Sequence, residues 1–102
     1  MASAPTHQHS AKPLTILQRV AINDPTAFAE CIDVYGNLIW ALARKLTVSM
    51  DEAEKAVREI FIDIWKFAGR FEATVLDEQI FIMTIARRRL INFLKKARHT
   101  IQ

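Results

Sequence analysis

Residues 77–98 read DEQIFIMTIARRRLINFLKKAR, and this stretch predicts a long amphipathic helix. Asp77 has a side-chain oxygen that can cap a helix amino end, and neither Pro nor Gly interrupts the residues that follow. At about 100° per residue, the apolar side chains of this stretch fall on one arc, which contains Ile82, Met83, Ala86, Leu90, Phe93, Leu94 and Ala97. We therefore expect one face of the helix to lie in the protein core.

The opposite arc of this predicted helix begins with an aromatic residue and ends with cations. Phe81 and Ile85 come first, and Arg88, Asn92, Lys95 and Lys96 follow. Between Ala86 and Gln102 there is no acid but there are six basic residues, namely Arg87, Arg88, Arg89, Lys95, Lys96 and Arg98. The residues before Ala86 contain 8 basic and 11 acidic side chains, so the net charge of +3 comes from this helix.

The composition predicts one helical domain. An apolar fraction of 51% with only two Gly and three Pro in 102 residues is typical of packed helices. No apolar run approaches the roughly 20 residues that cross a bilayer, and we see no secretory signal. A single cysteine excludes an internal disulfide and fits a reducing compartment, so we expect a cytoplasmic location. We expect residues 1–12 to be a flexible tail, with solvated His7 and His9, and residues 13–102 to form the domain.

Three further segments carry signals for the start of a helix. Thr15 with Gln18 and Ser49 with Glu52 match capping boxes, and Asp24 precedes a proline that suits a first helical position. We predict an all-α compact bundle of one short and three long helices, over residues 15–21, 25–46, 50–68 and 77–98.

The second predicted helix has an apolar stripe that we expect to be buried, consisting of Phe28, Cys31, Ile32, Tyr35, Leu38, Ile39, Leu42 and Leu46. We interpret Cys31 as core packing, because no base is visibly paired with it.

The sequence lacks the arrangements typical of an enzyme. It has no Gly-rich phosphate loop, no Cys/His cluster at metal-binding spacing and no evident nucleophile with a base, so we expect no catalysis, no cofactor and no metal. The basic helix fits either a solvated charged face or a nucleic-acid-binding surface. The lack of acids and the presence of Phe81 favour binding, because an exposed aromatic beside cations can stack on an unpaired base.

Three segments together resemble a known family. They are LQRVAINDPTAFAECIDVYGNLIWALARKL, DEAEKAVREIFIDIWKFAGRF and FIMTIARRRLINFLKKAR, with the motifs AEKAVREIFIDIW, KFAGRF and TIARRRLINFLKK in that order. Over residues 14–98 the chain resembles region 2 of an extracytoplasmic-function (ECF) sigma factor of bacterial RNA polymerase.

The resemblance implies a transcription initiation domain without catalytic activity. Its second and third helices would dock on a coiled coil of the polymerase clamp, through Glu52, Lys55, Arg58, Glu59, Ile62 and Trp65. Its last helix and the preceding loop would recognise and melt the promoter minus-ten element on the non-template strand. The implied DNA-binding residues are Phe71, Thr74, Phe81, Ile85, Arg87, Arg88, Asn92, Lys95 and Lys96. An anti-sigma factor is a further implied partner, and a membrane is not.

Two residues of the third helix depart from the family pattern. Lys55 stands where the family usually has Asp, and Arg58 stands where it usually has Gln. These cations favour an alternative function, in which the domain is a sigma-like interaction module that acts as a decoy or binds an anti-sigma protein. Such factors also carry a second domain for the minus-thirty-five element, which we do not expect within these 102 residues.

Overall fold

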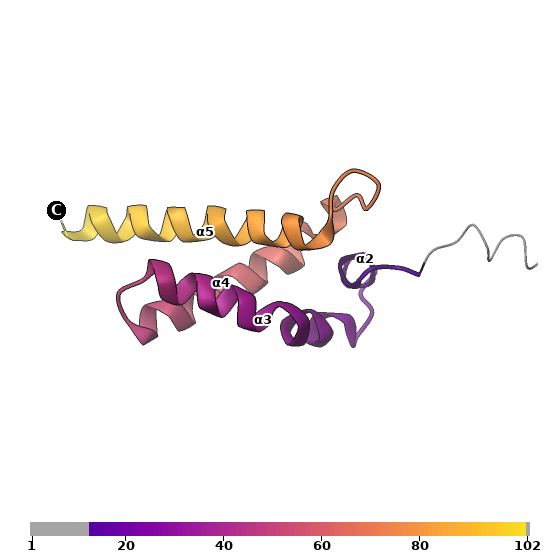
Figure 1. The fold of residues 1–102 in the computed structure, drawn as a ribbon, viewed down its shortest axis with the longest axis horizontal. Helices are drawn as coiled ribbons and strands as arrows, with labels where there is room; N and C mark the ends of the chain where they lie inside the picture. The colour runs from indigo at the N-terminus through magenta and orange to yellow at the C-terminus, as the bar shows by residue number, and fades with distance from the viewer. Residues whose placement is uncertain (1–12, 102) are drawn as a thin grey trace, which may run out of the picture.

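The computed structural model describes residues 13–101, with side chains described as far as Lys96. Within this range the chain is helical and contains no strand (Figure 1). The elements are α2 (Ile16–Ala21), α3 (Ala27–Leu46), α4 (Met50–Phe67), the 3-10 helix η1 (Ala68–Arg70) and α5 (Glu78–Ile101). The predicted all-α fold with one short and three long helices is confirmed. The predicted tail at residues 1–12, with His7 and His9, lies outside the described residues.

The three long helices pack against one another, and α4 makes the most extensive contacts with both α3 and α5. Figure 1 shows that α4 and α5 run in opposite directions, so the start of α4 and the carboxyl-terminal turns of α5 lie at the same end of the molecule. The short helix α2 packs on α3 and η1 at the other end. None of the helices in the described range combines the length and the apolar character needed to cross a membrane.

The predicted capping residues are found at three helix starts. The Thr15 hydroxyl accepts a hydrogen bond from the Gln18 backbone N–H at 3.2 Å, and the Gln18 side chain accepts one from the Thr15 N–H at 2.9 Å. The Ser49 hydroxyl accepts from the Glu52 N–H at 3.1 Å, and the Asp77 carboxylate accepts from the Gln79 N–H at 3.1 Å. These bonds satisfy N–H groups that a helix start otherwise leaves unpaired.

The start of α3 differs from the prediction by two residues, because the helix begins at Ala27 rather than at Pro25. Asp24, next to that proline, does not cap the helix directly. Its carboxylate instead accepts hydrogen bonds from the backbone N–H and the hydroxyl of Thr26, each at 3.0 Å. Asp24 therefore closes a tight turn before the helix, a common role for Asp in turns.

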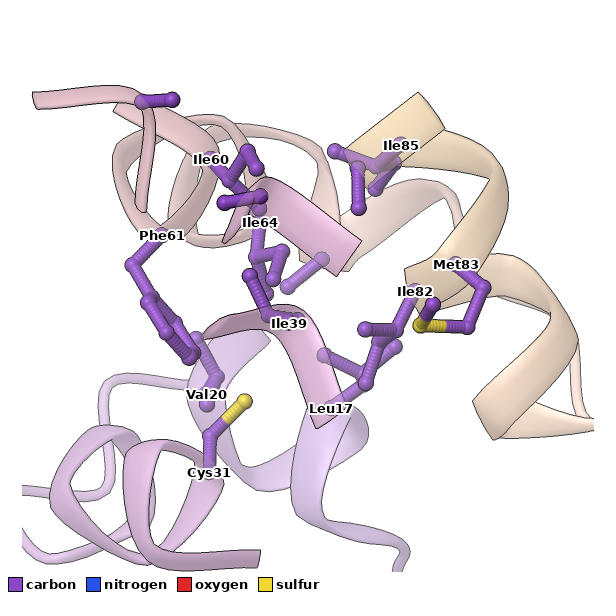
Figure 2. Packing of buried hydrophobic residues seen from close by; sticks show 14 of the residues in the cluster. Leu17, Val20, Cys31, Ile39, Ile60, Phe61, Ile64, Ile82, Met83 and Ile85 are labelled. Carbon is purple, nitrogen blue, oxygen red and sulfur yellow. The ribbon is translucent and has the colours of Figure 1, made fainter. Parts of the chain in front are cut away.

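The core consists of side chains from all four α-helices (Figure 2). Leu17, Ile39, Ile60, Ile64, Ile82 and Leu90 are among its fully buried members. Cys31 is also fully buried, and burial raises the pKa of its thiol to about 12, as suits the predicted packing role.

The predicted burial of the whole stripe on α3 is wrong at three positions. Ile32, Leu38 and Leu46 are exposed, with relative accessibilities of 42%, 40% and 37%. Leu46 lies in the last turn of α3, and helical periodicity alone does not show where along the helix its neighbours leave this stripe uncovered. Small residues, Ala27 and Ala43, occupy buried positions on the same helix.

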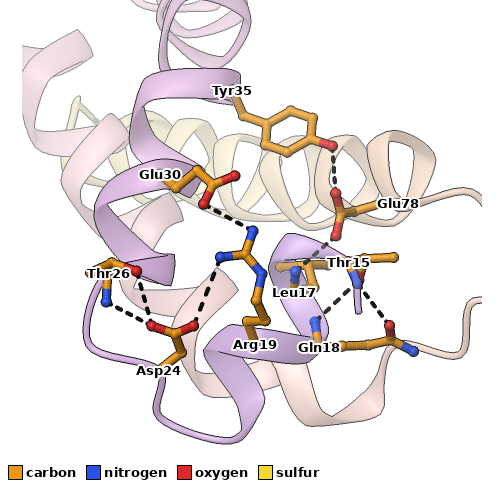
Figure 3. A network of polar contacts seen from close by, with 9 residues as sticks. All are labelled: Thr15, Leu17, Gln18, Arg19, Asp24, Thr26, Glu30, Tyr35 and Glu78. Carbon is orange, nitrogen blue, oxygen red and sulfur yellow. Dashed lines mark hydrogen bonds and ion pairs between the residues drawn. The ribbon is translucent and has the colours of Figure 1, made fainter. Parts of the chain in front are cut away.

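Glu78, in the first turn of α5, connects three helices (Figure 3). Its Oε1 accepts a hydrogen bond from the Tyr35 hydroxyl at 2.7 Å, and its Oε2 accepts one from the Leu17 backbone N–H at 2.8 Å. Burial, together with this hydrogen bond, raises the pKa of the Tyr35 phenol, which therefore keeps the proton that it donates. Glu78 thereby holds the amino end of α5 against α2 and α3.

We predict that Glu78→Ala lowers the free energy of unfolding by about 1.5–3 kcal/mol, because it removes a charged acceptor from two hydrogen bonds. Gln79→Ala is the matched control, since Gln79 is exposed in the same turn; it should change stability by less than about 0.5 kcal/mol. Urea denaturation followed by circular dichroism measures both. Equal stabilities of the two variants would contradict the connecting role of Glu78.

Candidate nucleic-acid interface

A partly buried ion pair joins α5 to α4. Arg89 donates two hydrogen bonds to Asp63, from Nε to Oδ2 and from Nη2 to Oδ1, each at 2.7 Å. The Asp63 side chain is only 10% exposed, and Arg89 Nη1 lies 3.7 Å from Glu59 Oε1. The hydrogen bonds to Asp63 raise the pKa of the Arg89 guanidinium. Arg89 therefore holds the two helices together.

The described polar residues of the predicted DNA-facing arc are exposed. They are Arg88, Asn92, Lys95 and Lys96; Arg87, which the resemblance also assigned to DNA binding, is exposed outside this arc. The Asp63–Arg89 pair and the buried residues Ala86 and Leu90 fix the direction in which this arc faces. The arc is therefore a solvent-facing cationic surface, as predicted.

At the amino end of this arc lies a cavity of about 120 Å³, lined by Phe67, Arg70, Leu76, Phe81, Thr84, Ile85 and Arg88. The sequence had singled out Phe81, Ile85 and Arg88 from this set. It missed Phe67, Arg70, Leu76 and Thr84. The Arg70 guanidinium lies over the Phe67 ring, 4.9 Å from its centroid. The cavity therefore combines aromatic walls with two cations, Arg70 and Arg88.

Two aromatic residues and one isoleucine are less exposed than predicted. Phe71 is buried, and its ring makes an edge contact with Phe81 at a centroid distance of 5.3 Å. Ile85 was placed on the water-facing side and is only 8% exposed. The physical reason is that Ile85 belongs to the hydrophobic core cluster, to which α4 also contributes Ile60 and Ile64. Phe81 is half-buried and forms a wall of the cavity, whereas Thr74 is exposed in the loop and does not line it.

The residues of α4 that the resemblance assigned to polymerase binding fall into two groups. Glu52, Lys55 and Glu59 line a groove of about 220 Å³ between α4 and α5, together with Arg89, Asn92, Phe93 and Lys96. We call this the α4–α5 groove. Arg58, Ile62 and Trp65 are exposed and do not line it. Trp65 instead borders a second cavity of about 220 Å³, with Val20, Asn23, Asp24, Pro25 and Phe28.

No metal centre is evident in the described part of the chain, where no three His, Cys, Asp or Glu side chains gather closely enough to hold an ion.

We predict that Arg89→Met lowers the free energy of unfolding by about 2–3 kcal/mol, because Asp63 is left nearly buried without its partner. Arg88→Met is the matched control and should cost less than about 0.5 kcal/mol, since Arg88 is exposed. The double variant Asp63→Leu/Arg89→Met should recover most of the loss, because an apolar pair leaves no buried charge. Denaturation midpoints that are equal for Arg89→Met and Arg88→Met would refute this assignment.

Comparison with known proteins agrees with this geometry. The ECF RNA polymerase sigma factor SigK of Mycobacterium tuberculosis is 27% identical over 77 residues, which cover 76% of this chain and 41% of the relative. SigK of Mycobacterium bovis shows the same values, and SigK of Mycobacterium sp. strain KMS is 22% identical over 77 residues. The chain thus spans about two fifths of the length of these curated relatives. No solved structure matches it significantly.

The family assignment rests on a longer match. Residues 31–100, which are 70 of the 102 residues, match Sigma-70 region 2. This family is non-enzymatic, in agreement with the prediction from the sequence. The matched range includes α3 from Cys31 onward, α4, η1 and α5 up to residue 100, and so contains both the cavity beside Phe81 and the α4–α5 groove. The chain belongs to the Sigma-70 region 2 family.

Proposed function

We propose that this domain acts in transcription initiation, where α4 binds core RNA polymerase and α5 recognises and melts the promoter minus-ten element. The observation that carries the proposal is the continuity of one surface. Phe81 and Arg88 line the same cavity, and the exposed arc continues from Arg88 to Lys95. Membership of the Sigma-70 region 2 family supports the same function.

The cavity has the chemistry to hold an unpaired base. Its aromatic walls offer a stacking surface, which favours bases of any sequence because every base has a π-face. The Thr84 hydroxyl donates to the Ile80 carbonyl at 2.7 Å, so its oxygen can still accept a hydrogen bond from a base. A paired base keeps both of its faces stacked within the duplex. The surface should therefore prefer the single-stranded non-template strand.

The cations along α5 suit the phosphates of the same strand. Arg88 and Lys95 are exposed about two turns apart on one side of the helix. Contacts to phosphates position a strand without reading its sequence, whereas contacts to bases can select it. We infer that the arc from Arg88 to Lys95 positions the strand and that the cavity reads or captures a base.

For polymerase binding, the exposed side of α4 offers Arg58, Ile62 and Trp65. Ile62 and Trp65 are 54% and 55% exposed, although both are large and apolar. Arg and Trp are also the residue types that most often dominate binding energy at protein interfaces. We propose that these three residues form the centre of the polymerase contact.

The DNA prediction concerns Phe81, and it uses Phe81→Leu because Leu keeps apolar volume against Phe71. Wild-type chain should bind a single-stranded oligonucleotide with a log–log salt slope of roughly −2 to −4, from three to six phosphate contacts at about −0.7 each. Phe81→Leu should cost roughly 1–3 kcal/mol with little change in slope, since stacking releases no counterions. Arg88→Ala should instead reduce the magnitude of the log–log salt slope, because it removes a phosphate contact. Fluorescence anisotropy at low salt measures both. Undiminished affinity of Phe81→Leu would show that Phe81 serves only in packing.

The polymerase prediction compares two isoleucines that are each 54% exposed, Ile62 and Ile80. Ile62→Asp should weaken co-purification with core RNA polymerase by about 2–4 kcal/mol, because it places an unpaired charge in an apolar contact. Ile80→Asp, on α5, should leave co-purification intact. If the two variants behave alike, this side of α4 is not the contact. Retained polymerase binding in a chain that binds no DNA would favour the alternative, a sigma-like interaction module.

A further inference from the structure

Lys55 is an exposed cation of α4 at the edge of the α4–α5 groove. It takes part in none of the ion pairs or side-chain hydrogen bonds found among the described residues. Across the groove, α5 contributes Asn92 and Lys96, which lie on the same exposed arc as Lys95. Lys55 thus extends the cationic surface of α5 onto the neighbouring helix.

The register of the two helices places Lys55 opposite Asn92. The helices α4 and α5 are antiparallel, and Arg89 Nη1 lies 3.7 Å from Glu59 Oε1. The residue one turn before Glu59 on α4 therefore faces the residue one turn after Arg89 on α5. These two residues are Lys55 on α4 and Asn92 on α5. Asn92 can donate two hydrogen bonds through its amide, and Lys55 can donate three.

The two acids of the groove already have partners within the chain. Glu59 lies beside Arg89, and Glu52 Oε1 accepts a hydrogen bond from the Val48 backbone N–H at 3.1 Å, at the amino end of α4. The positive end of the helix dipole also lies there. The part of the groove between Lys55 and Asn92 is therefore the part best suited to an anion.

We propose that Lys55 binds a backbone phosphate of the DNA strand across the α4–α5 groove, together with Asn92 and Lys96. This inference rests on the proposed DNA-binding function and adds a phosphate site outside the helix that carries the other cations. Arg88 and Lys96 are about 12 Å apart along α5 at 1.5 Å per residue. A single strand that spans this distance can therefore contact both residues and reach from the cavity to the groove.

The test measures the salt dependence of single-stranded DNA binding by the full chain. Lys55→Gln should reduce the magnitude of the log–log slope by about 0.7, the value for one phosphate contact on a single strand. Arg58→Gln is the matched control, because it removes an exposed cation from the same helix outside the groove, and it should leave the slope unchanged. An unchanged slope for Lys55→Gln, or an equal reduction in both variants, would overturn the proposal.

A second variant is expected to bind DNA more tightly, a result that loss of folding cannot produce. Glu52→Gln keeps an acceptor for the Val48 N–H but removes a negative charge from the groove. It should bind DNA roughly two- to fivefold more tightly at low salt, and the gain should fade as salt rises. Unaltered or weaker binding by Glu52→Gln would count against a phosphate in the groove.

Two controls distinguish a failure of the Lys55 site from a failure of the proposed DNA-binding function. If the wild-type chain binds no DNA, or if Arg88→Ala leaves the slope unchanged, the proposed DNA-binding function itself fails. If Arg88→Ala reduces the magnitude of the salt slope and Lys55→Gln does not, only the proposal of a phosphate site at Lys55 is refuted. Inorganic phosphate should compete no better than chloride at equal ionic strength. Stronger competition that disappears in Lys55→Gln would instead assign the groove to a small phosphate ligand.

Discussion

The hydrogen-bonded ion pair between Asp63 and Arg89 determines which side of α5 faces solvent. Residues 87–89 are three consecutive arginines, and on a helix they point about 100° apart, so only one of them can face α4. Asp63 pairs with Arg89, which leaves Arg87 and Arg88 exposed. The buried neighbours Ala86 and Leu90 require the same rotation. Apolar packing and a charge pair thus agree on one orientation, which aligns Arg88 with the cavity and Lys95 with the outer surface.

The cavity depends on a second set of contacts at the other end of α5. Glu78 is bonded to α2 and α3, and Phe71 is packed on Phe81, so the loop over residues 71–77 is held at both ends. The residues that line the cavity come from the end of α4, from η1, from this loop and from α5. A site with walls from several elements needs these elements to be positioned before a ligand arrives. Such preorganisation lowers the cost of ordering side chains on binding.

The sequence predicted the helices well because capping residues and apolar periodicity are local signals. Thr15, Ser49 and Asp77 each begin a helix through the hydrogen bonds expected of them. It failed where the outcome depends on distant residues. Periodicity placed Arg88 on the outer arc and left Arg89 out of it, but it could not identify Asp63, 26 residues away, as the partner of Arg89. The burial of Ile85 likewise depends on its place in the core cluster, to which distant residues of α4 contribute, and helical periodicity within α5 does not reveal this.

The structure places the two residues that depart from the family pattern, Lys55 and Arg58, in different surroundings on α4. From the sequence, Lys55 and Arg58 appear as one change of charge on a polymerase-binding face. In the structure Lys55 borders the α4–α5 groove, whereas Arg58 lies outside it with Ile62 and Trp65. The proposed centre of the polymerase contact then carries a single substitution, of a neutral residue by a cation at Arg58. Arg is a residue type enriched at protein interfaces, so this substitution alone is compatible with polymerase binding.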